Sequence, residues 1–308
     1  MTTLWGYGRR VRWHAKRALD AALGALFIGL LKAIRHIDRI WVSDVFARCT
    51  RAIGPRLREH KLGHANLTAA FPDKTPAEIE EILLGVWDNL GRVGAEFAHL
   101  DRLLVGDPFN LPYFAFDPVM AERYDRIRDG GKPALVFAAH LANWELPAIV
   151  AHAWGVDALT LYRRPNVGAV ADAVIAIREG SMGTLVPTDM DAPIRLARAL
   201  EANRVVGMLV DQYYVKGVDV TFFGRRCRTN PLLATLARHV DCPIHGARIV
   251  RLPGGRFRGE VTEAIPPVRD ADGKIDVQGT MQAVTTVIEG WIREHPEQWL
   301  WLHRRWRD

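Results

Sequence analysis

The alternation of short apolar runs with helical stretches constrains the fold of this chain more than any other feature. It begins near residue 133 and continues to residue 294. Such alternation is typical of βαβ units, which assemble into a largely parallel sheet. We expect strands over 133–139, 158–162, 184–187, 205–210, 218–223, 244–250 and 257–265, and helices near 143–153, 168–179, 191–202, 231–240 and 278–294. The sequence therefore predicts an α/β fold with a central, largely parallel sheet flanked by helices.

The N-terminal third has a different character, because residues 1–100 follow helical spacing almost throughout. The sequence Thr75-Pro76-Ala77-Glu78 has the pattern of a capping box and predicts the start of a long helix. A hydrophobic content of 49% over 308 residues is ordinary for a folded chain, and no linker rich in Gly and Ser divides it. We expect a single domain over 41–308, with a helical layer at 41–130 and an α/β part at 131–308.

An apolar run from Ala21 to Leu31 lies between clusters of basic residues. At 11 residues, the run is shorter than the roughly 20 residues that a helix needs to cross a bilayer. The sequence Lys32-Ala33-Ile34-Arg35-His36 follows it in place of a small-residue cleavage site, which argues against a cleaved signal peptide. We therefore predict a membrane-anchoring helix region at 1–40 that dips into or lies along an anionic membrane surface. A helix packed against its own domain is the alternative.

A His and a Glu flank the point where the first predicted strand ends. The apolar run from Pro133 leads to His140, and Glu145 follows five residues later, with Asn143 between them as a possible helix N-cap. On one continuous helix this pair would be separated by about 140°, so the two side chains converge only if a turn separates them. The carboxyl ends of parallel strands are where α/β folds carry their sites. We interpret His140 as a general base and Glu145 as the acid that orients it, although a structural role for such a pair is common.

The patterns of several other enzyme classes are missing from the sequence. No dinucleotide or P-loop glycine motif follows a predicted strand, and no G-x-S-x-G nucleophile elbow is present. The three cysteines and eleven histidines form no metal-ligand spacing. A base without a nucleophile beside it fits the activation of a hydroxyl group that belongs to the substrate.

Anionic partners are favoured by the charge of the chain, which has 41 Lys and Arg against 35 Asp and Glu. Arg163 and Arg164 end one predicted strand and could grip a phosphate or carboxylate, although structural salt bridges explain most Arg pairs. Asp211 and Gln212 end another strand at the same predicted edge, where a turn-capping role for Asp211 is the alternative. The loop that begins at Phe222-Phe223-Gly224 and continues to Thr229 mixes aromatic and basic residues, as a loop lying against acyl chains and phosphates would. A solvated basic turn is the alternative.

Three Trp and three Arg lie close together near the C-terminus, within residues 299–307. Nucleic acid binding would use Trp rings for base stacking and Arg for phosphates. A membrane interface would place the same residues at headgroup depth. The composition of this segment leaves both alternatives open.

Taken together, these segments resemble the bacterial lipid A biosynthesis acyltransferases, the late lauroyl and myristoyl transferases of the lysophospholipid acyltransferase superfamily. The resemblance covers residues 20 to 306, and the closing motif is specific to that family. The doubled Arg at 163–164 leaves open which guanidinium has the family's phosphate-binding role. The segments that carry the resemblance are His140-x4-Glu145, Tyr162-Arg163, Asp211-Gln212, Phe222-Phe223-Gly224 with Thr229, and Pro296-Glu297-Gln298-Trp299-x-Trp301-x-His303-Arg304-Arg305-Trp306, together with Asn66-Leu67, Phe71-Pro72, Trp87-x-Asn89-x-Gly91 and Glu96 upstream.

The resemblance implies transfer of a fatty acyl chain from acyl carrier protein to the hydroxyl of an acyl chain on a Kdo-bearing lipid A precursor. It implies inner membrane lipids as partners, a location at the cytoplasmic face of the inner membrane, and no nucleic acid, cofactor or metal. His140 and Glu145 would be catalytic, with Asp211 assisting the base. Substrate-binding roles would fall to Arg163, Arg164, Gln212, Phe223, Gly224, Thr229, Trp301, His303, Arg304 and Arg305. An acyltransferase that acts on another glycolipid, phospholipid or aminolipid, with acyl-CoA as donor, is the alternative.

Overall fold

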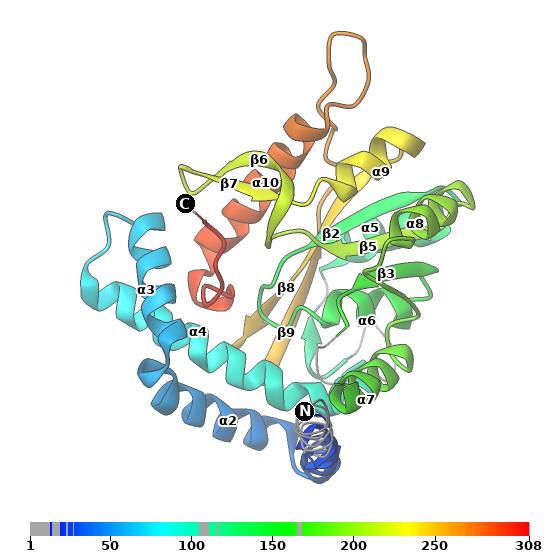
Figure 1. The fold of residues 1–308 in the computed structure, drawn as a ribbon. Helices are drawn as coiled ribbons and strands as arrows, with labels where there is room; N and C mark the ends of the chain where they lie inside the picture. The colour runs from blue at the N-terminus through cyan, green and yellow to red at the C-terminus, as the bar shows by residue number, and fades with distance from the viewer. Residues whose placement is uncertain are drawn as a thin grey trace, which may run out of the picture.

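A seven-stranded sheet in the order β1-β9-β8-β2-β5-β3-β4 forms the centre of the molecule (Figure 1). The computed structural model describes residues 13, 19–22, 24–26, 28–104, 111–115, 117–164 and 168–307. Among these residues, β8 and β9 are the one antiparallel pair of the sheet, and its other neighbouring strands are parallel. This arrangement confirms the predicted α/β fold. The strands are β1 (Phe114–Ala115), β2 (Ala134–Ala138), β3 (Ala158–Tyr162), β4 (Thr184–Pro187), β5 (Val205–Leu209), β8 (Ile244–Leu252) and β9 (Arg256–Val261).

Helices cover both faces of the sheet. Side chains alternate between the two faces of a strand. In β2, Leu135 and Phe137 pack with α8, α9 and α10, whereas Val136 packs with α5 and α6 and with Ile177 of α7. Because both faces are covered, β2 is a nearly continuous apolar run, as is typical of buried parallel strands. The helices are α5 (Pro118–Asp129), α6 (Leu146–Ala153), α7 (Gly168–Glu179), α8 (Ala192–Glu201), α9 (Leu232–Val240) and α10 (Val277–Glu294).

Three further helices, α2 (Arg39–Ile53), α3 (Arg58–Ala70) and α4 (Pro76–Glu96), form a layer beside the sheet (Figure 1). The predicted capping box at the start of α4 is confirmed, because Thr75 and Glu78 each accept a hydrogen bond from the other's backbone N–H. Helices α2 and α4 cross closely at Gly91, where a Cβ atom would lie 2.6 Å from the carbonyl oxygen of Phe46. A glycine is therefore required at this crossing. The boundaries predicted within the chain at residues 40 and 130 stay predictions.

Helical backbone also precedes α2, at residues 19–22, 24–26 and 28–34. Much of the predicted membrane-anchoring region, namely residues 1–12, 14–18, 23 and 27, lies outside the described residues. Where its side chains are described, Leu31 and Ile34 are buried against α2 and α4, whereas Leu19, Leu26 and Leu30 are exposed. The described part of the chain has no helix whose length and apolar character would suffice to cross a membrane.

A separate antiparallel hairpin, β6 (Tyr213–Phe222) and β7 (Arg225–Thr229), stands where the sequence predicted one strand and a loop. Phe223 and Gly224 both have positive φ, 51° and 69°, which a tight hairpin turn requires. Only Gly224 indicated this turn, because Phe rarely adopts that conformation. The two Phe rings do not lie on a surface that could contact acyl chains, as the sequence interpretation had it, because Phe222 and Phe223 are 1% and 5% exposed.

The aromatic residues of the C-terminal segment lie in the same core as this hairpin. Trp299, Trp301 and Trp306 are 1%, 0% and 8% exposed. Trp299 and Trp306 contact the ring of Phe222, and Trp301 contacts that of Phe223. These rings are therefore unavailable for stacking on bases or for lying at a membrane interface, and both interpretations of the three Trp are wrong.

Candidate active site

His140 lies in a loop that joins β2 to α6, at the carboxyl edge of the sheet. The C-terminal segment holds this loop by backbone hydrogen bonds: the Ala142 N–H donates to Gln298 O (2.8 Å) and the Leu300 N–H donates to His140 O (3.1 Å). Ala142 has a φ of 46°, which is a strained value for a residue with a side chain. The loop is longer than predicted, because α6 begins at Leu146. Asn143 is not its N-cap; the Asn143 Oδ1 instead accepts a hydrogen bond from the Glu145 N–H.

Asp211, at the end of β5, is the carboxylate that binds His140. Its Oδ1 lies 2.8 Å from His140 Nδ1, and its Oδ2 accepts hydrogen bonds from the His140 backbone N–H (2.8 Å) and from the Trp299 indole N–H (2.7 Å). Since a carboxylate only accepts, Nδ1 of His140 carries the proton. His140 Nε2 is then the acceptor of the ring, and the Gln212 side-chain amide N–H donates to it (3.2 Å).

The charge of Asp211 controls the protonation of His140. Burial alone would lower the pKa of His140, but the charge and hydrogen bond of Asp211, with a smaller effect of Glu145, outweigh it and raise the pKa. Burial would raise the pKa of Asp211, but His140 and, more weakly, His303 lower it well below its usual range. The structure therefore supplies a base with a fixed tautomer and an ionised partner.

Glu145 does not orient His140, which corrects the sequence interpretation. Its carboxylate forms a bidentate pair with Arg178 of α7, with Oε2 2.8 Å from Nε and Oε1 2.5 Å from Nη2. The two side chains are 8% and 17% exposed. Glu145 affects His140 only through the electrostatic effect of its charge. The hydrogen bond to His140 that we expected from Glu145 is made by Asp211. No sequence signal identified Arg178, because it lies 33 residues along the chain in an ordinary helix.

A buried polar network supports the same loop from the side of α4. Glu96 is 0% exposed, and its carboxylate accepts hydrogen bonds from Asn143 Nδ2 (2.9 Å) and from the guanidinium of Arg251. Asn89 donates to Ala142 O (3.1 Å) and accepts from Arg251 Nε (2.8 Å). The upstream residues that carried the resemblance thus connect the helical layer to the loop of His140.

His140 faces a cavity of about 650 Å³. The cavity lies between the sheet and α6, on the face of β2 to which Val136 points. His140, Arg163 and Gln212 line it just beyond the carboxyl ends of β2, β3 and β5, Asn230 also lines it, and most of its lining is apolar. Residues that line the interior include Val136, Ala138, Ala148, Ala151, Val156, Ala158, Leu185, Val205 and Gly207.

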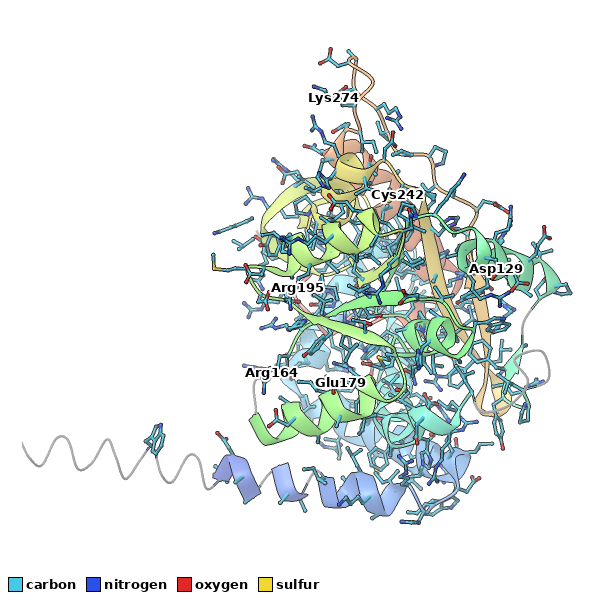
Figure 2. All side chains as sticks on the ribbon, turned by 90° about the vertical axis from the view of Figure 1, so that its right-hand side faces the viewer. Asp129, Arg164, Glu179, Arg195, Cys242 and Lys274 are labelled. Atoms are coloured by element: carbon cyan, nitrogen blue, oxygen red, sulfur yellow. The ribbon has the colours of Figure 1, made fainter. Side chains whose placement is uncertain are left out.

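The two consecutive arginines lie in different places. Arg163 lines the cavity, whereas Arg164 is at the surface, where its Nη2 lies 2.7 Å from Asp172 Oδ1 (Figure 2). Between the two guanidiniums that the sequence left open, Arg163 is therefore the one at the site. The predicted phosphate contact of either arginine stays a prediction.

The predicted residues of the hairpin support the site from behind. Thr229 is fully buried, and its hydroxyl donates to Val210 O (2.8 Å), directly before Asp211. Phe223 and Gly224 form the hairpin turn and are not in the wall of the cavity. Thr229 therefore holds the end of β5, and none of these three residues lines the cavity.

The residues of the closing motif also lie outside the cavity wall. Trp301 donates its indole N–H to Pro296 O (2.8 Å), and Arg305 is 1% exposed and lies over the ring of Phe222. His303 Nδ1 lies 2.6 Å from Leu300 O, and burial lowers the pKa of His303 to about 4, so that it is neutral. Arg304 is exposed. A substrate-binding role for these four residues stays a prediction, and the contacts of Trp301, His303 and Arg305 support a structural role for those three.

Some residues of the site were not found from the sequence. Besides Arg178, Trp144 lies with its ring centroid 5.3 Å from that of His140, and Asn230 lines the cavity. Within the described residues, no group of three or more His, Cys, Asp or Glu side chains is placed to hold a metal ion.

Comparison with protein families matches residues 12–308 to the family described as bacterial lipid A biosynthesis acyltransferase. A search of curated proteins found no match.

Proposed function

The chain belongs to the bacterial lipid A biosynthesis acyltransferases, and we propose that it is a late enzyme of that pathway. It transfers a fatty acyl group from acyl carrier protein to the hydroxyl of an acyl chain on a Kdo-bearing lipid A precursor. The observation that carries this proposal is His140, because its unprotonated Nε2 lies at a largely apolar cavity while Asp211 holds its Nδ1. A base beside an apolar chain-sized cavity fits the transfer of a fatty acyl group to a hydroxyl.

In the proposed mechanism, His140 Nε2 removes the proton of the acceptor hydroxyl as its oxygen attacks the thioester carbonyl carbon. The new ester C–O bond forms, the C–S bond breaks, and the imidazolium returns its proton to the leaving thiolate. Asp211 stabilises the imidazolium and keeps the tautomer, as the orienting acid of a catalytic triad does. General-base catalysis of this kind contributes about 10²- to 10⁴-fold.

Arg163 supplies a cation at the mouth of the cavity. In the proposed complex it binds a phosphate, either of the lipid acceptor or of the donor's phosphopantetheine arm. A guanidinium is suited to this role because its planar fork matches phosphate oxygens. The net charge of +6 attracts acyl carrier protein, which is acidic.

We also propose that the chain binds the cytoplasmic face of the inner membrane through the segment before α2. Leu26 and Leu30 are 70% and 47% exposed there, and Trp41 at the start of α2 is 59% exposed. Exposed apolar side chains on one helical segment are a typical membrane contact.

The decisive experiment for the function incubates the purified protein with fatty acyl thioesters of acyl carrier protein or coenzyme A and with a tetraacylated Kdo-lipid A precursor. We expect a pentaacylated product with the carrier protein donor, detected by mass spectrometry. His140→Ala should reduce turnover by about 10²- to 10⁴-fold, whereas His239→Ala, at an exposed His on α9, should not. Wild-type turnover by His140→Ala would refute the role of the base. A product only with another lipid acceptor or only with acyl-CoA would refute the proposed substrates.

The membrane contact is tested by flotation with vesicles that contain anionic lipid. A double substitution of Leu26 and Leu30 by Glu should abolish flotation, because it places charges in the apolar contact. Val268→Glu changes an exposed apolar residue elsewhere (40% exposed) and serves as the control. Unchanged flotation of the double variant would count against this contact.

A further inference from the structure

Small side chains of β2, β5 and β3 form one wall of the cavity. Residues paired across these three strands make up rows. Parallel register places Gly207 of β5 between Val136 of β2 and Thr160 of β3. Two residues deeper, Val205 lies beside Ala158 in the same way. All five residues line the cavity. Each row lies about 6.6 Å from the next, since a strand rises roughly 3.3 Å per residue.

Gly207 leaves space in this part of the cavity wall because it has no side chain. A Cβ atom added there would have Thr160 Oγ1, at 3.9 Å, as its nearest neighbour, which is ordinary van der Waals contact. Its φ is not in the left-handed region, so the backbone does not require glycine. Glycine weakens a strand interior, and it is often found where a ligand approaches the backbone closely. The missing side chain therefore leaves space for a ligand.

A small apolar cluster lies at the amino ends of these strands, on the side of the cavity away from His140. Val156 and Val205 are buried there with Ala134, and Ala151 and Ala158 pack against them. A chain that enters past His140 passes the row of Gly207 before it reaches this end. The depth available beyond Gly207 is controlled by the size of the side chains at positions 207 and 158.

We propose that Gly207 and Ala158 determine the length of the fatty acyl chain that the enzyme accepts from its donor. This inference rests on the proposed acyl transfer. Gly207 lets the chain extend into the deep part of the cavity, and Ala158 limits how far it extends. The two positions differ in depth by one row, which is two residues of strand rise. That distance corresponds to about five methylene groups of an extended chain.

The test is a competition among saturated acyl carrier protein thioesters of graded chain length, with the product lengths measured by mass spectrometry. Gly207→Leu should shift the preferred donor to shorter chains and lower the ratio of kcat/KM for long over short donors on the order of 100-fold, since each methylene loses its burial. Ala158→Leu should shorten the preferred chain less. Gly290→Leu is the matched control, because it adds the same side chain at an exposed position of α10 with no atom within 4 Å of its Cβ.

Two results would overturn the proposal. One is a Gly207→Leu enzyme that keeps the wild-type length preference, or that loses activity equally for all lengths. The other is a change in preference for the chain length of the acceptor alone, because the cavity would then hold the acceptor. A wild-type protein without acyl transfer would refute the proposed function instead. In that case the binding of free saturated fatty acids of graded length still tests positions 207 and 158, and unchanged length dependence in Gly207→Leu would overturn their role.

Discussion

The substitution Asp211→Asn should change the tautomer of His140 while it keeps the other hydrogen bonds around Asp211. Both the His140 backbone N–H and the Trp299 indole N–H donate to Asp211 Oδ2, so the amide oxygen of an Asn keeps these two hydrogen bonds. Its NH₂ group then faces His140 Nδ1, which has to become an acceptor. The proton of the neutral ring moves to Nε2, and the lone pair that faces the cavity is lost.

Two measurable effects follow from this exchange. The rate of acyl transfer should fall by about 10²- to 10⁴-fold, the range of general-base catalysis. The pKa of His140 should fall below its ordinary value of 6.5, because the effect of Asp211 that raises it is removed and burial, which lowers it, stays. If deprotonation of His140 activates the enzyme as proposed, the pH midpoint of kcat/KM should lie above 6.5 in the wild type and below 6.5 in the variant.

The assay measures kcat/KM for acyl transfer across pH in the wild type, in Asp211→Asn and in Asp219→Asn. Asp219 is the control because it pairs with Arg226 on the surface of the hairpin and has no contact with His140. Thermal unfolding of each variant checks that the fold is kept. An Asp211→Asn enzyme with the wild-type rate and the wild-type midpoint would refute the assignment of Asp211 as the partner of the base.

Other substitutions test the supports of the site. Arg178→Ala leaves the buried Glu145 carboxylate without its partner, so chemical denaturation should show a loss of about 3–5 kcal/mol of unfolding free energy, with partial recovery in Arg178→Lys. Trp299→Phe removes the indole hydrogen bond to Asp211 and should lower the unfolding free energy by about 1.5–3 kcal/mol; an unchanged value would show that this bond is not stabilising. The lowered pKa of Asp211 contributes stability that is fully present above its unfolded value of about 3.9 and is lost as pH falls through the folded value. Acid unfolding curves should therefore fall less steeply below pH 4 in Asp211→Asn than in the wild type, and parallel curves would contradict this.

Most of the sheet could be predicted because its strands are apolar runs with clear ends. β3 and β4 match the predicted ranges, and the start of α4 was fixed by the local chemistry of Thr75 and Glu78. The hairpin was missed because one of its two turn residues, Phe223, gives no turn signal. Local sequence patterns indicate local backbone preferences. They do not indicate that core contacts hold the ring of Phe223.

The site, too, could be predicted only in part from the sequence. Sequence placed His140 and Asp211 at one edge of the sheet, because both follow apolar strands. It could not choose the partner of His140, since Glu145 is five residues away in the chain while Asp211 is 71 residues away and closer in space. The sequence interpretation also placed Trp299 and Trp301 at the surface, because Trp and Arg close together in a chain are typical of interfaces. Their burial follows from tertiary contacts with Phe222 and Phe223, which no short pattern reveals.

The C-terminal segment that holds the loop of His140 has a consequence for how the molecule is made. Asn89 and Gln298 are 209 residues apart, and Asp211 and Trp299 are 88 residues apart, yet all four meet around one loop. Contacts between such distant parts of a chain form late in folding, because long loops must close first. During synthesis, a nascent chain that has not yet reached Gln298 has the strand that leads to His140 but lacks the groups that fix its loop. The geometry of the His140 loop is therefore complete only after Gln298 and Trp299 have been synthesised and have packed against it.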